Sequence, residues 1–341
     1  RSNILAKYES KDTGKPITLA SEVDIPRAIE NFNFFANFSE NFYFESNIES
    51  EVSINSVFKQ ALGVVGCISP WNLPLYLFTW KIAPALIVGN TVLAKPSEIT
   101  PLTASKLAEI CSDIGLPAGV LNIVNGSGQV AGDLLVKNKN IKAISFTGGT
   151  DTGKKIYRNS FASLKKLSLE MGGKNPAIIF EDCNYESMLK NVVKSSFTNQ
   201  GQICLCSSRI LVEETIFEKF KTDFCNAISE LNIGDPKYDK TQFGSITSDE
   251  QFKKIKHYIN LAKNENGNIL LGGKAIQLQG RCKNGWFIEP TVIEGLDNRS
   301  RLNQEEIFGP VVTLQSFKSE EEAIEIANDT QYGLSATIWT N

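Results

Sequence analysis

Short apolar runs alternate with longer amphipathic stretches from Ala61 onward. The runs ALGVVGCIS, TVLAK, VLNIV and IKAISF are rich in β-branched residues and bounded by turn residues, which predicts strands. Between them the periodicity is helical, and Thr100 with Pro101 predicts an N-cap followed by a proline in the first helical position. Strands and helices that alternate in this way form parallel sheets with right-handed crossovers. The pattern therefore predicts a doubly wound α/β domain.

The alternation starts again near LSLEMGGKNPAIIF and continues through RILVE and the amphipathic stretch EETIFEKFKTDFCNAISEL. We therefore predict two doubly wound parallel-sheet domains, residues 1–172 and residues 173–341, with a boundary near Gly172 and Gly173. The polar segment of residues 40–60 has Val52, Ile54 and Val57 spaced as in a strand. This segment predicts a small protruding β-hairpin.

Composition narrows the classes of function. The 341 residues are 42% hydrophobic with a formal net charge of −3, so sizeable cores are expected and no nucleic-acid surface is indicated. Lys81 and Pro84 interrupt the most apolar stretch, and the sequence does not open with a basic segment and an apolar run. We expect a soluble, cytoplasmic protein without a membrane partner. The seven cysteines have irregular spacing and no zinc-ligand pattern with histidine, which predicts reduced thiols and no metal site.

Two glycine clusters follow predicted strands. GSGQVAG misses the dinucleotide fingerprint by one residue, so a tight strand-to-helix turn explains it equally well. Gly148 and Gly149 begin a G-x-x-x-x-G-K sequence that also occurs in phosphate-binding loops of nucleotide triphosphatases, but Lys155 stands where those loops have serine or threonine. Either interpretation places backbone N–H groups at a helix N-terminus, where a phosphate group is favoured.

The segment KPSE places Lys95 and Glu98 just past a predicted strand. A carboxylate there can accept hydrogen bonds from both hydroxyls of an adenosine ribose and repels a 2′-phosphate, and Lys95 could reach the same hydroxyls. A solvated surface loop is the alternative interpretation.

The stretch NQGQICLCSSR contains a candidate nucleophile, Cys204. A reactive cysteine needs a base, a cation or a helix N-terminus that favours its thiolate. The single histidine, His257, lies in the lysine-rich segment KKIKHYINLAK and is expected to be solvated, so a cysteine–histidine pair is not indicated. Glu170 remains as the candidate base, because the glycines that follow it in LEMGGK allow close approach to its carboxylate.

Six motifs now stand in one order along the whole chain and jointly resemble the aldehyde dehydrogenase superfamily: PWNLP, KPSE, FTGGTDTG, LEMGGK, GQIC and EEIFGPV. The resemblance implies that Cys204 attacks the aldehyde and that the Asn72 side-chain amide and the Cys204 backbone N–H hold the oxyanion. Glu170 would then activate the water that releases the acid. Cys206 would be a neighbour able to form a reversible disulfide with the nucleophile.

The same resemblance implies NAD as the cofactor, with residues 1–172 as its domain and residues 173–341 as the catalytic domain. The implied contacts are Trp71, Lys95 and Glu98 for the adenosine, Gly148 and Gly149 for the pyrophosphate, and Glu306 and Phe308 for the nicotinamide ribose. Glu98 favours NAD over NADP. The hairpin of residues 40–60 would join subunits in a homo-oligomer, a dimer or tetramer.

Within the family, DIPRAIENFNFFA and SPWNLPLYLFTWKIAPA resemble the branch that oxidises muconic semialdehydes, which carry a carboxylate. In that branch the arginine of DIPR binds the carboxylate, so Arg27 inherits this role, with a surface helix position as the alternative. Wider relatives oxidise retinal or betaine aldehyde. Family members begin earlier and continue past ATIWTN, so we expect this sequence to be a fragment without both termini.

Two further classes of function stay open. A coenzyme A-acylating semialdehyde dehydrogenase passes its thioester to a thiol and usually lacks the glutamate, so Glu170 argues against it. An inactive, truncated nucleotide-binding protein is the other, and the complete set of chemical residues argues against that reading.

Overall fold

The computed structural model describes residues 1–341, and the chain forms two compact units. The first unit contains Arg1–Asp12 and Ala20–Glu170, and the second contains Thr13–Leu19 and Met171–Asn341. The chain thus passes into the second unit directly after Glu170, near the glycine pair that marked the predicted boundary. None of the helices combines the length and the apolar character needed to cross a lipid bilayer.

The first unit is built on a five-stranded sheet in which every strand is parallel to its neighbours. Its strands, in the order β5-β4-β3-β6-β7, are Leu121–Ile123, Thr91–Lys95, Val64–Ile68, Ile141–Thr147 and Lys166–Glu170. Its α-helices are α1 (Ser2–Thr13, which ends at the border of the unit), α3 (Ile25–Glu40), α4 (Pro74–Ile87), α5 (Leu102–Asp113), α6 (Asp133–Lys137) and α7 (Thr150–Ser160). Short π- or 3-10-helical turns cover Ala20–Asp24, Gly128–Gly132 and Phe161–Ser163.

The start of α5 differs from the prediction. Pro101 occupies the N-cap position and the helix begins at Leu102, without a hydrogen bond from a capping side chain at that position. The Leu102 N–H instead donates to the Asp12 carboxylate, 2.9 Å away. The prediction that Thr100 caps this helix was therefore wrong, because a carboxylate distant in the sequence satisfies one of the exposed N–H groups of the first turn.

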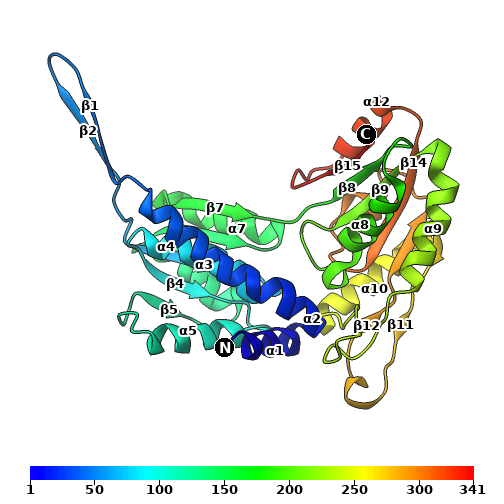
Figure 1. Ribbon diagram of the computed structural model, residues 1–341, viewed down its shortest axis with the longest axis horizontal. Coiled ribbons are helices and arrows are strands. Elements are labelled where there is room, and N and C mark those ends of the chain that lie inside the picture. The colour runs from blue at the N-terminus through cyan, green and yellow to red at the C-terminus, as the bar shows by residue number, and fades with distance from the viewer. The chain divides into compact units, whose positions relative to one another are not determined.

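A two-stranded antiparallel hairpin projects from the first unit (Figure 1). It consists of β1 (Glu45–Glu49) and β2 (Ile54–Phe58), and every residue of both strands is exposed. The predicted hairpin is therefore present, and its alternating pattern reflects strand pairing without a buried face.

The second unit contains a six-stranded sheet with one antiparallel edge strand. Its strands, in the order β10-β13-β14-β9-β8-β15, are Asn268–Leu271, Thr291–Glu294, Val311–Phe317, Ser207–Glu213, Asn175–Ile179 and Thr337–Trp339. The strands β11 (Ala275–Ile276) and β12 (Phe287–Ile288) form a separate pair. Its α-helices are α2 (Ile17–Leu19), α8 (Tyr185–Phe197), α9 (Phe217–Ser229), α10 (Asp249–Asn264), α11 (Arg301–Gln304) and α12 (Glu320–Asn328), and 3-10 turns cover Thr198–Gly201, Glu214–Ile216 and Gly280–Cys282.

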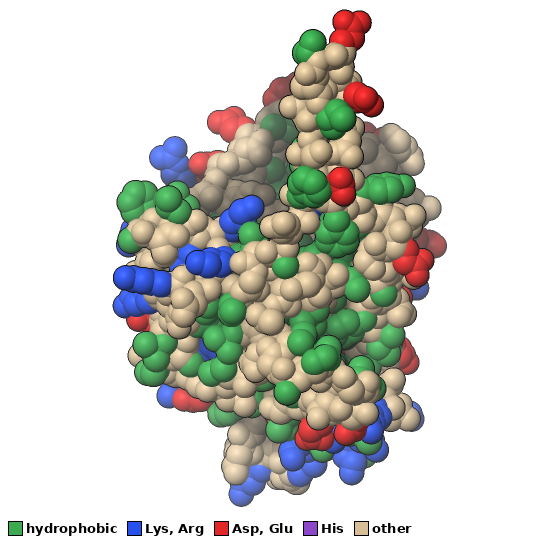
Figure 2. Space-filling model, turned by 90° about the vertical axis from the view of Figure 1, so that its left-hand side faces the viewer, with side chains coloured by type: hydrophobic (Ala, Val, Ile, Leu, Met, Phe, Trp, Pro, Cys, Tyr) green, Lys and Arg blue, Asp and Glu red, His purple; other side chains and the backbone are tan.

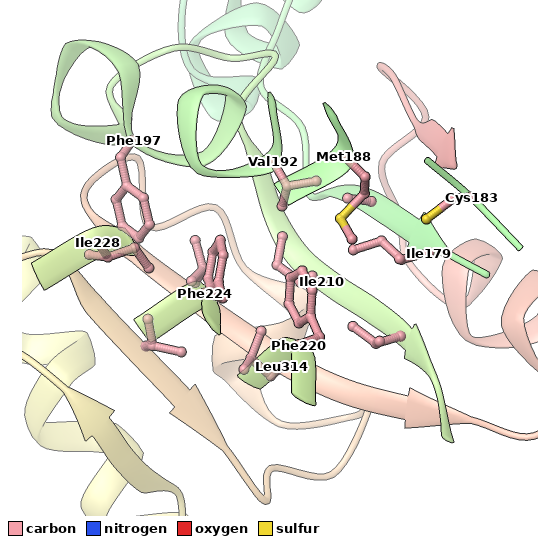
Figure 3. Packing of buried hydrophobic residues seen from close by; sticks show 14 of the residues in the cluster. Ile179, Cys183, Met188, Val192, Phe197, Ile210, Phe220, Phe224, Ile228 and Leu314 are labelled. Carbon is pink, nitrogen blue, oxygen red and sulfur yellow. The ribbon is translucent and has the colours of Figure 1, made fainter. Parts of the chain in front are cut away.

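The core of the second unit packs α8 and α9 onto this sheet (Figure 3). Phe220 and Phe224 of α9 are fully buried, and their rings stack with centroids 5.1 Å apart. Burying a phenylalanine side chain contributes roughly 1.5–3 kcal/mol, so these rings fix α9 firmly on the sheet.

Candidate active site

In the first unit, most of the predicted site residues lie at the carboxyl ends of four adjacent strands. Trp71 and Asn72 follow β3, Lys95 and Glu98 end or follow β4, Gly148 and Gly149 follow β6, and Glu170 ends β7. Because these strands are parallel neighbours, their carboxyl ends share one edge of the sheet. Backbone hydrogen bonds connect the loops at this edge, from Ser69 to Lys95 and from Gly148 to Glu170.

Lys95, Glu98 and the glycine cluster GSGQVAG form one network at this edge. The buried Lys95 ammonium contacts the Glu98 carboxylate at 3.0 Å, and the other Glu98 oxygen accepts a hydrogen bond from the Gly128 N–H at 3.1 Å. Burial works to raise the pKa of Glu98, but N–H donors, including that of Gly128, and the Lys95 ammonium bring it below its ordinary value. An ionised, partly exposed carboxylate is thus held beside a glycine turn, as an acceptor for ribose hydroxyls requires.

Gly149 is the N-cap of α7, with extended backbone angles of φ −67° and ψ 145°. A Cβ at Gly149 would meet nothing within 4 Å, so the N-terminus of α7 is open to a ligand. Residues 150–154 already belong to α7, and the Gly153 N–H donates to the Gly149 carbonyl. The G-x-x-x-x-G-K sequence therefore runs into a helix and does not form the loop of a nucleotide triphosphatase.

Sequence reasoning missed Lys81 as a functional candidate. Asn72 is buried in the turn before α4, and Lys81 is buried within α4, with its ammonium 3.5 Å from the Ser145 hydroxyl. Burial lowers the pKa of Lys81 to about 8, while Cys67 and Glu170 oppose the shift. The lone cation in an otherwise apolar stretch was the available signal, because a buried lysine needs a compensating partner or a role.

Arg27 lies on α3 at the rim of a hollow of about 400 Å³ that it lines together with Glu30, Asn31, Asn33, Phe34 and Trp80. Its guanidinium donates to the Tyr76 hydroxyl at 3.2 Å and lies over the Tyr76 ring, 5.4 Å from the centroid. About half of the side chain is exposed, at 49%. The guanidinium also contacts the Glu30 carboxylate at 3.4 Å, so Arg27 is a partly exposed cation of α3 with Tyr76 and Glu30 as its partners.

In the second unit, Cys204 follows an unusual left-handed turn. Asn199, Gln200 and Gly201 have φ angles of 54°, 58° and 68°. Such angles are costly for the two residues with side chains, so surrounding contacts must hold the turn. A Cβ on Gly201 would lie 2.2 Å from the Gly309 carbonyl oxygen, so only glycine allows the turn to pack against the segment EEIFGPV.

Two buried glutamines hold this turn. The Gln200 amide donates to the Ser245 carbonyl at 3.0 Å and accepts from the Gly244 N–H at 3.1 Å. Gln202 accepts from the Thr247 N–H at 3.2 Å and donates to the Asn199 carbonyl. The glutamines of NQGQIC are thus structural supports of the cysteine, which explains why the motif is polar although both side chains are completely buried.

One pocket of the second unit brings three predicted site residues together. Cys204, Glu306 and Phe308 all line it, with Gly173 beside them. Gln251 of α10 donates to the carbonyls of Ile307 and Phe308 and so fixes the backbone of this segment. The candidate nucleophile and the two residues implied for the nicotinamide ribose therefore share one surface, although about a hundred residues separate them.

Glu306 lies in an electrostatically unusual place. Its carboxylate accepts from the Gly173 N–H at 3.2 Å, and a Cβ on Gly172 would collide with it. Burial raises the pKa of Glu306, although the Gly173 N–H and the ammonium groups of Lys254 and Lys174 oppose the shift. Lys174 is fully buried, and burial followed by the Arg209 charge lowers its pKa to about 7. Sequence reasoning missed both lysines. Lys254 in particular is spaced like a surface residue of α10.

Cys206 differs strongly from Cys204. Cys204 is partly exposed, whereas Cys206 is buried, and its thiol donates to the Thr198 carbonyl at 3.8 Å. Burial raises the pKa of the Cys206 thiol to about 12. Cys206 therefore remains a thiol at neutral pH, and no disulfide joins any of the seven cysteines.

The first unit has a parallel sheet with an open helix N-terminus and an ionised carboxylate beyond its strands, and the second unit has a partly exposed cysteine in a pocket. These features are typical of a dinucleotide-dependent oxidoreductase that uses a cysteine. The sequence matches the aldehyde dehydrogenase family over residues 1–341, and the chain belongs to this family. It is 47% identical over 335 residues to 2-aminomuconic semialdehyde dehydrogenase of Danio rerio. The aligned region covers 97% of this chain and 69% of the relative.

Two further relatives illustrate the breadth of the match. The chain is 44% identical to 2-aminomuconic 6-semialdehyde dehydrogenase of a Pseudomonas species, over 97% of the chain and 69% of the relative. The crystal structure of betaine aldehyde dehydrogenase from Staphylococcus aureus in complex with NAD⁺ superposes with a TM-score of 0.95 at 38% identity, over 99% of this chain and 66% of that one. The predicted family and two-domain α/β fold are confirmed.

Proposed function

We propose that the protein oxidises a carboxylated semialdehyde to the acid with NAD, through a thiohemiacetal and a thioester on Cys204. The observation that carries this proposal is the pocket in which Cys204 meets Glu306 and Phe308. A nucleophile and the residues assigned to the redox end of the cofactor must share a surface if hydride is to leave the carbon that the sulfur holds.

The chain supplies the covalent chemistry. The Cys204 thiolate attacks the aldehyde carbon, and the oxygen becomes an oxyanion. The Asn72 amide and the Cys204 N–H are the donors that we assign to this oxyanion, and donors of this kind are worth roughly 2.7–4 kcal/mol each in acyl-transfer enzymes. Glu170 acts as the general base that takes a proton from water, and the hydroxide so formed attacks the thioester and releases the acid and the thiol.

The residues of the chain fit NAD. The Glu98 carboxylate, held by Lys95 and the Gly128 N–H, would bind the adenosine ribose, and its charge disfavours a 2′-phosphate. The open N-terminus of α7 at Gly149 would bind the pyrophosphate, and the Glu306 carboxylate would bind the nicotinamide ribose. When bound, NAD accepts the hydride that leaves the carbon attached to Cys204. The solved relative from Staphylococcus aureus contains NAD⁺, which supports this assignment.

The substrate class is inferred from Arg27 and from the relatives. A muconic semialdehyde carries a carboxylate, and a guanidinium can bind a carboxylate with two parallel hydrogen bonds. Arg27 stands at the rim of a hollow, and the Tyr76 ring and hydroxyl hold its orientation. The two named 2-aminomuconic relatives are dehydrogenases of such semialdehydes. Oxidation of betaine aldehyde or an uncharged aldehyde is the competing function.

A panel of aldehydes tests this function. NADH formation, followed by absorbance, should be fastest with 2-hydroxymuconic semialdehyde, slower with hexanal and betaine aldehyde, and weak with NADP in place of NAD. Arg27→Ala should lower kcat/KM for the carboxylated substrate by about 10- to 100-fold, because a hydrogen bond to a charged group is worth about 1.5–3 kcal/mol. Arg27→Lys should keep part of the preference.

The exposed Arg158 of α7 offers the matched control, and Arg158→Ala should leave the ranking of substrates unchanged. If Arg27→Ala lowers kcat/KM equally for charged and uncharged aldehydes, the carboxylate role is wrong while aldehyde oxidation stands. If the wild-type protein reduces NAD with none of the aldehydes, the proposed function itself is wrong.

We also propose that the hairpin of β1 and β2 joins subunits in a homo-oligomer. Ile48, Ile54 and Phe58 are each more than 60% exposed, at 67%, 67% and 62%. Figure 2 shows hydrophobic side chains along the hairpin with acidic side chains beside them. A two-stranded hairpin is only marginally stable alone in water, and unpaired strand edges readily bind another chain. A partner surface would supply the missing contacts.

Charged substitutions on one face of the hairpin test its role in assembly. Ile48 and Val57 lie on the same face, since Ile48 pairs with Asn55 and Val57 pairs with Ser46. The double variant Ile48→Glu, Val57→Glu should shift the protein to smaller species in sedimentation velocity, with unchanged thermal unfolding of the units. Val52→Glu, between the strands, is the control. An unchanged sedimentation profile of the double variant would exclude this face as the interface.

A further inference from the structure

Asn175 lies at the start of β8 and is 3% exposed. Its side-chain Nδ2 donates to the Cys204 carbonyl at 2.6 Å and to the Cys206 carbonyl at 3.1 Å. Its Oδ1 accepts from the Ser335 N–H at 3.2 Å. One amide therefore connects the cysteine loop, the first strand of the second unit and the segment before β15.

The backbone around Asn175 is shaped for these contacts. The register between β8 and β9 shifts at Asn175 and Pro176, where Asn175 pairs with Ser207 and Pro176 pairs with Arg209. A bulge of this kind redirects a side chain, and Pro176 needs no hydrogen-bond partner for its nitrogen. The Asn175 side chain is thereby turned toward the loop that contains Cys204.

Gly173 provides the space for the amide oxygen. A Cβ on Gly173 would lie 2.6 Å from Asn175 Oδ1 and 3.0 Å from the Leu334 side chain. The second glycine of LEMGGK is thus needed so that Asn175 can reach Ser335. The Gly173 N–H donates to Glu306, so the same residue borders both the pocket and the Asn175 contacts.

We propose that Asn175 is a positioning residue for Cys204. By holding the Cys204 carbonyl, the amide restricts the backbone torsion that follows the Cys204 Cα, and with it the direction of the Cα–Cβ bond that carries the sulfur. The bond to the Cys206 carbonyl prevents the loop from rotating as a unit. The Ser335 N–H holds the amide oxygen and so sets which edge of the amide presents its donors. This inference rests on the proposed role of Cys204 as the nucleophile.

Asn175→Asp is the sharpest test, because the aspartate has the same shape and keeps an acceptor for the Ser335 N–H, but turns an acceptor toward two carbonyls. We expect the hydride burst and kcat to fall by on the order of 100-fold, the loss that a displacement of about 1 Å can cause, with little change in KM for NAD. Alkylation of Cys204 by iodoacetamide, read by mass spectrometry, should slow as well. Asn175→Ser retains one donor and should be intermediate.

The pH profile separates positioning from loss of structure. A buried aspartate that faces carbonyls has a raised pKa, and its protonated form can again donate one hydrogen bond. The ratio of Asn175→Asp to wild-type alkylation rates should therefore rise as the pH falls. Asn90→Asp is the matched control, since Asn90 is also buried, donates to the Ala85 carbonyl and accepts from the Leu62 N–H. It should leave Cys204 alkylation unchanged.

The outcomes distinguish this inference from the function on which it rests. If Asn175→Asp and Asn175→Ser fold, judged by thermal unfolding, and alkylate and turn over like the wild type, the positioning role is wrong. If the ratio of rates does not depend on pH, the loss in Asn175→Asp is structural and the inference is likewise wrong. If Cys204→Ala still oxidises aldehydes, the nucleophile assignment has failed, whatever Asn175 does.

Discussion

Cys204→Ala should abolish NADH formation with every aldehyde, with a loss on the order of 10⁴-fold or more, comparable to the removal of the nucleophile from other enzymes that form covalent acyl intermediates. The expected loss is large because neither the thiohemiacetal nor the thioester can form without the sulfur. The left-handed turn and the two buried glutamines orient the loop around Cys204, so alanine should be accommodated without a change in fold. NADH absorbance under saturating NAD and aldehyde measures the effect.

Two other cysteines of the same unit provide the controls for this experiment. Cys225 is half-buried in α9 and lies outside the pocket, so Cys225→Ala should retain activity. Cys206→Ala removes a buried thiol whose pKa of about 12 keeps it protonated, and it should cost stability more than turnover. Retention of activity in Cys204→Ala together with its loss in Cys206→Ala would contradict our assignment of the nucleophile.

The strands and the edge of the first sheet could be predicted from the sequence for a clear physical reason. Parallel strands are buried on both faces and are therefore continuous β-branched runs, such as VVGCI in β3 and TVLAK in β4. Residues that follow parallel neighbouring strands lie at the carboxyl ends of the sheet, and Asn72, Glu98 and Gly148 follow β3, β4 and β6 as the pattern predicts. The cap of α5 could not be predicted from the local sequence, because the Leu102 N–H donates to Asp12, which lies ninety positions away.

In the second unit, the candidate site residues lie at the amino ends of the strands and not at the carboxyl ends. Gly173 precedes β8, Cys204 precedes β9, and Glu306 precedes β14, and these three strands are parallel neighbours. The pocket therefore lies at the amino ends of these strands. The general rule places ligands of parallel sheets at the carboxyl ends, so it does not predict this pocket. Motif resemblance singled out Cys204 and Glu306 as candidates, and the structure places both in one pocket. The turn at residues 199–201 and the contacts of the Asn175 amide depend on segments that are distant in the sequence. No local pattern contains that information.

The two glycine pairs show the same difference between what a local pattern predicts and what depends on contacts between distant segments. Gly148 and Gly149 could be interpreted from their position before a helix, because a helix N-terminus attracts anions wherever it occurs. The pair Gly172 and Gly173 was interpreted as room for a ligand, whereas the structure fills that room with the Glu306 carboxylate and the Asn175 amide. Glycine indicates that something approaches closely, and the sequence does not tell which group it is.

Glu170→Gln should separate hydride transfer from hydrolysis. Glutamine has nearly the shape of glutamate but cannot take a proton from water, so the thioester on Cys204 should form at a near-normal rate and then persist. We expect a rapid burst of about one NADH per site, followed by turnover that is slower by roughly 10²- to 10⁴-fold, the usual contribution of a general base. Stopped-flow absorbance resolves the two phases, and intact-mass spectrometry should detect the acylated protein.

Hydroxylamine makes this test specific for the last step. It attacks a thioester without a general base, forms the hydroxamate and releases the thiol, so it should restore much of the turnover of Glu170→Gln and change the wild type little. Glu213 also ends a parallel strand, β9, and Glu213→Gln is the matched control that should show no burst and normal turnover. Loss of the burst itself in Glu170→Gln would instead place Glu170 before hydride transfer, as the base that deprotonates Cys204, and hydroxylamine would then have no effect.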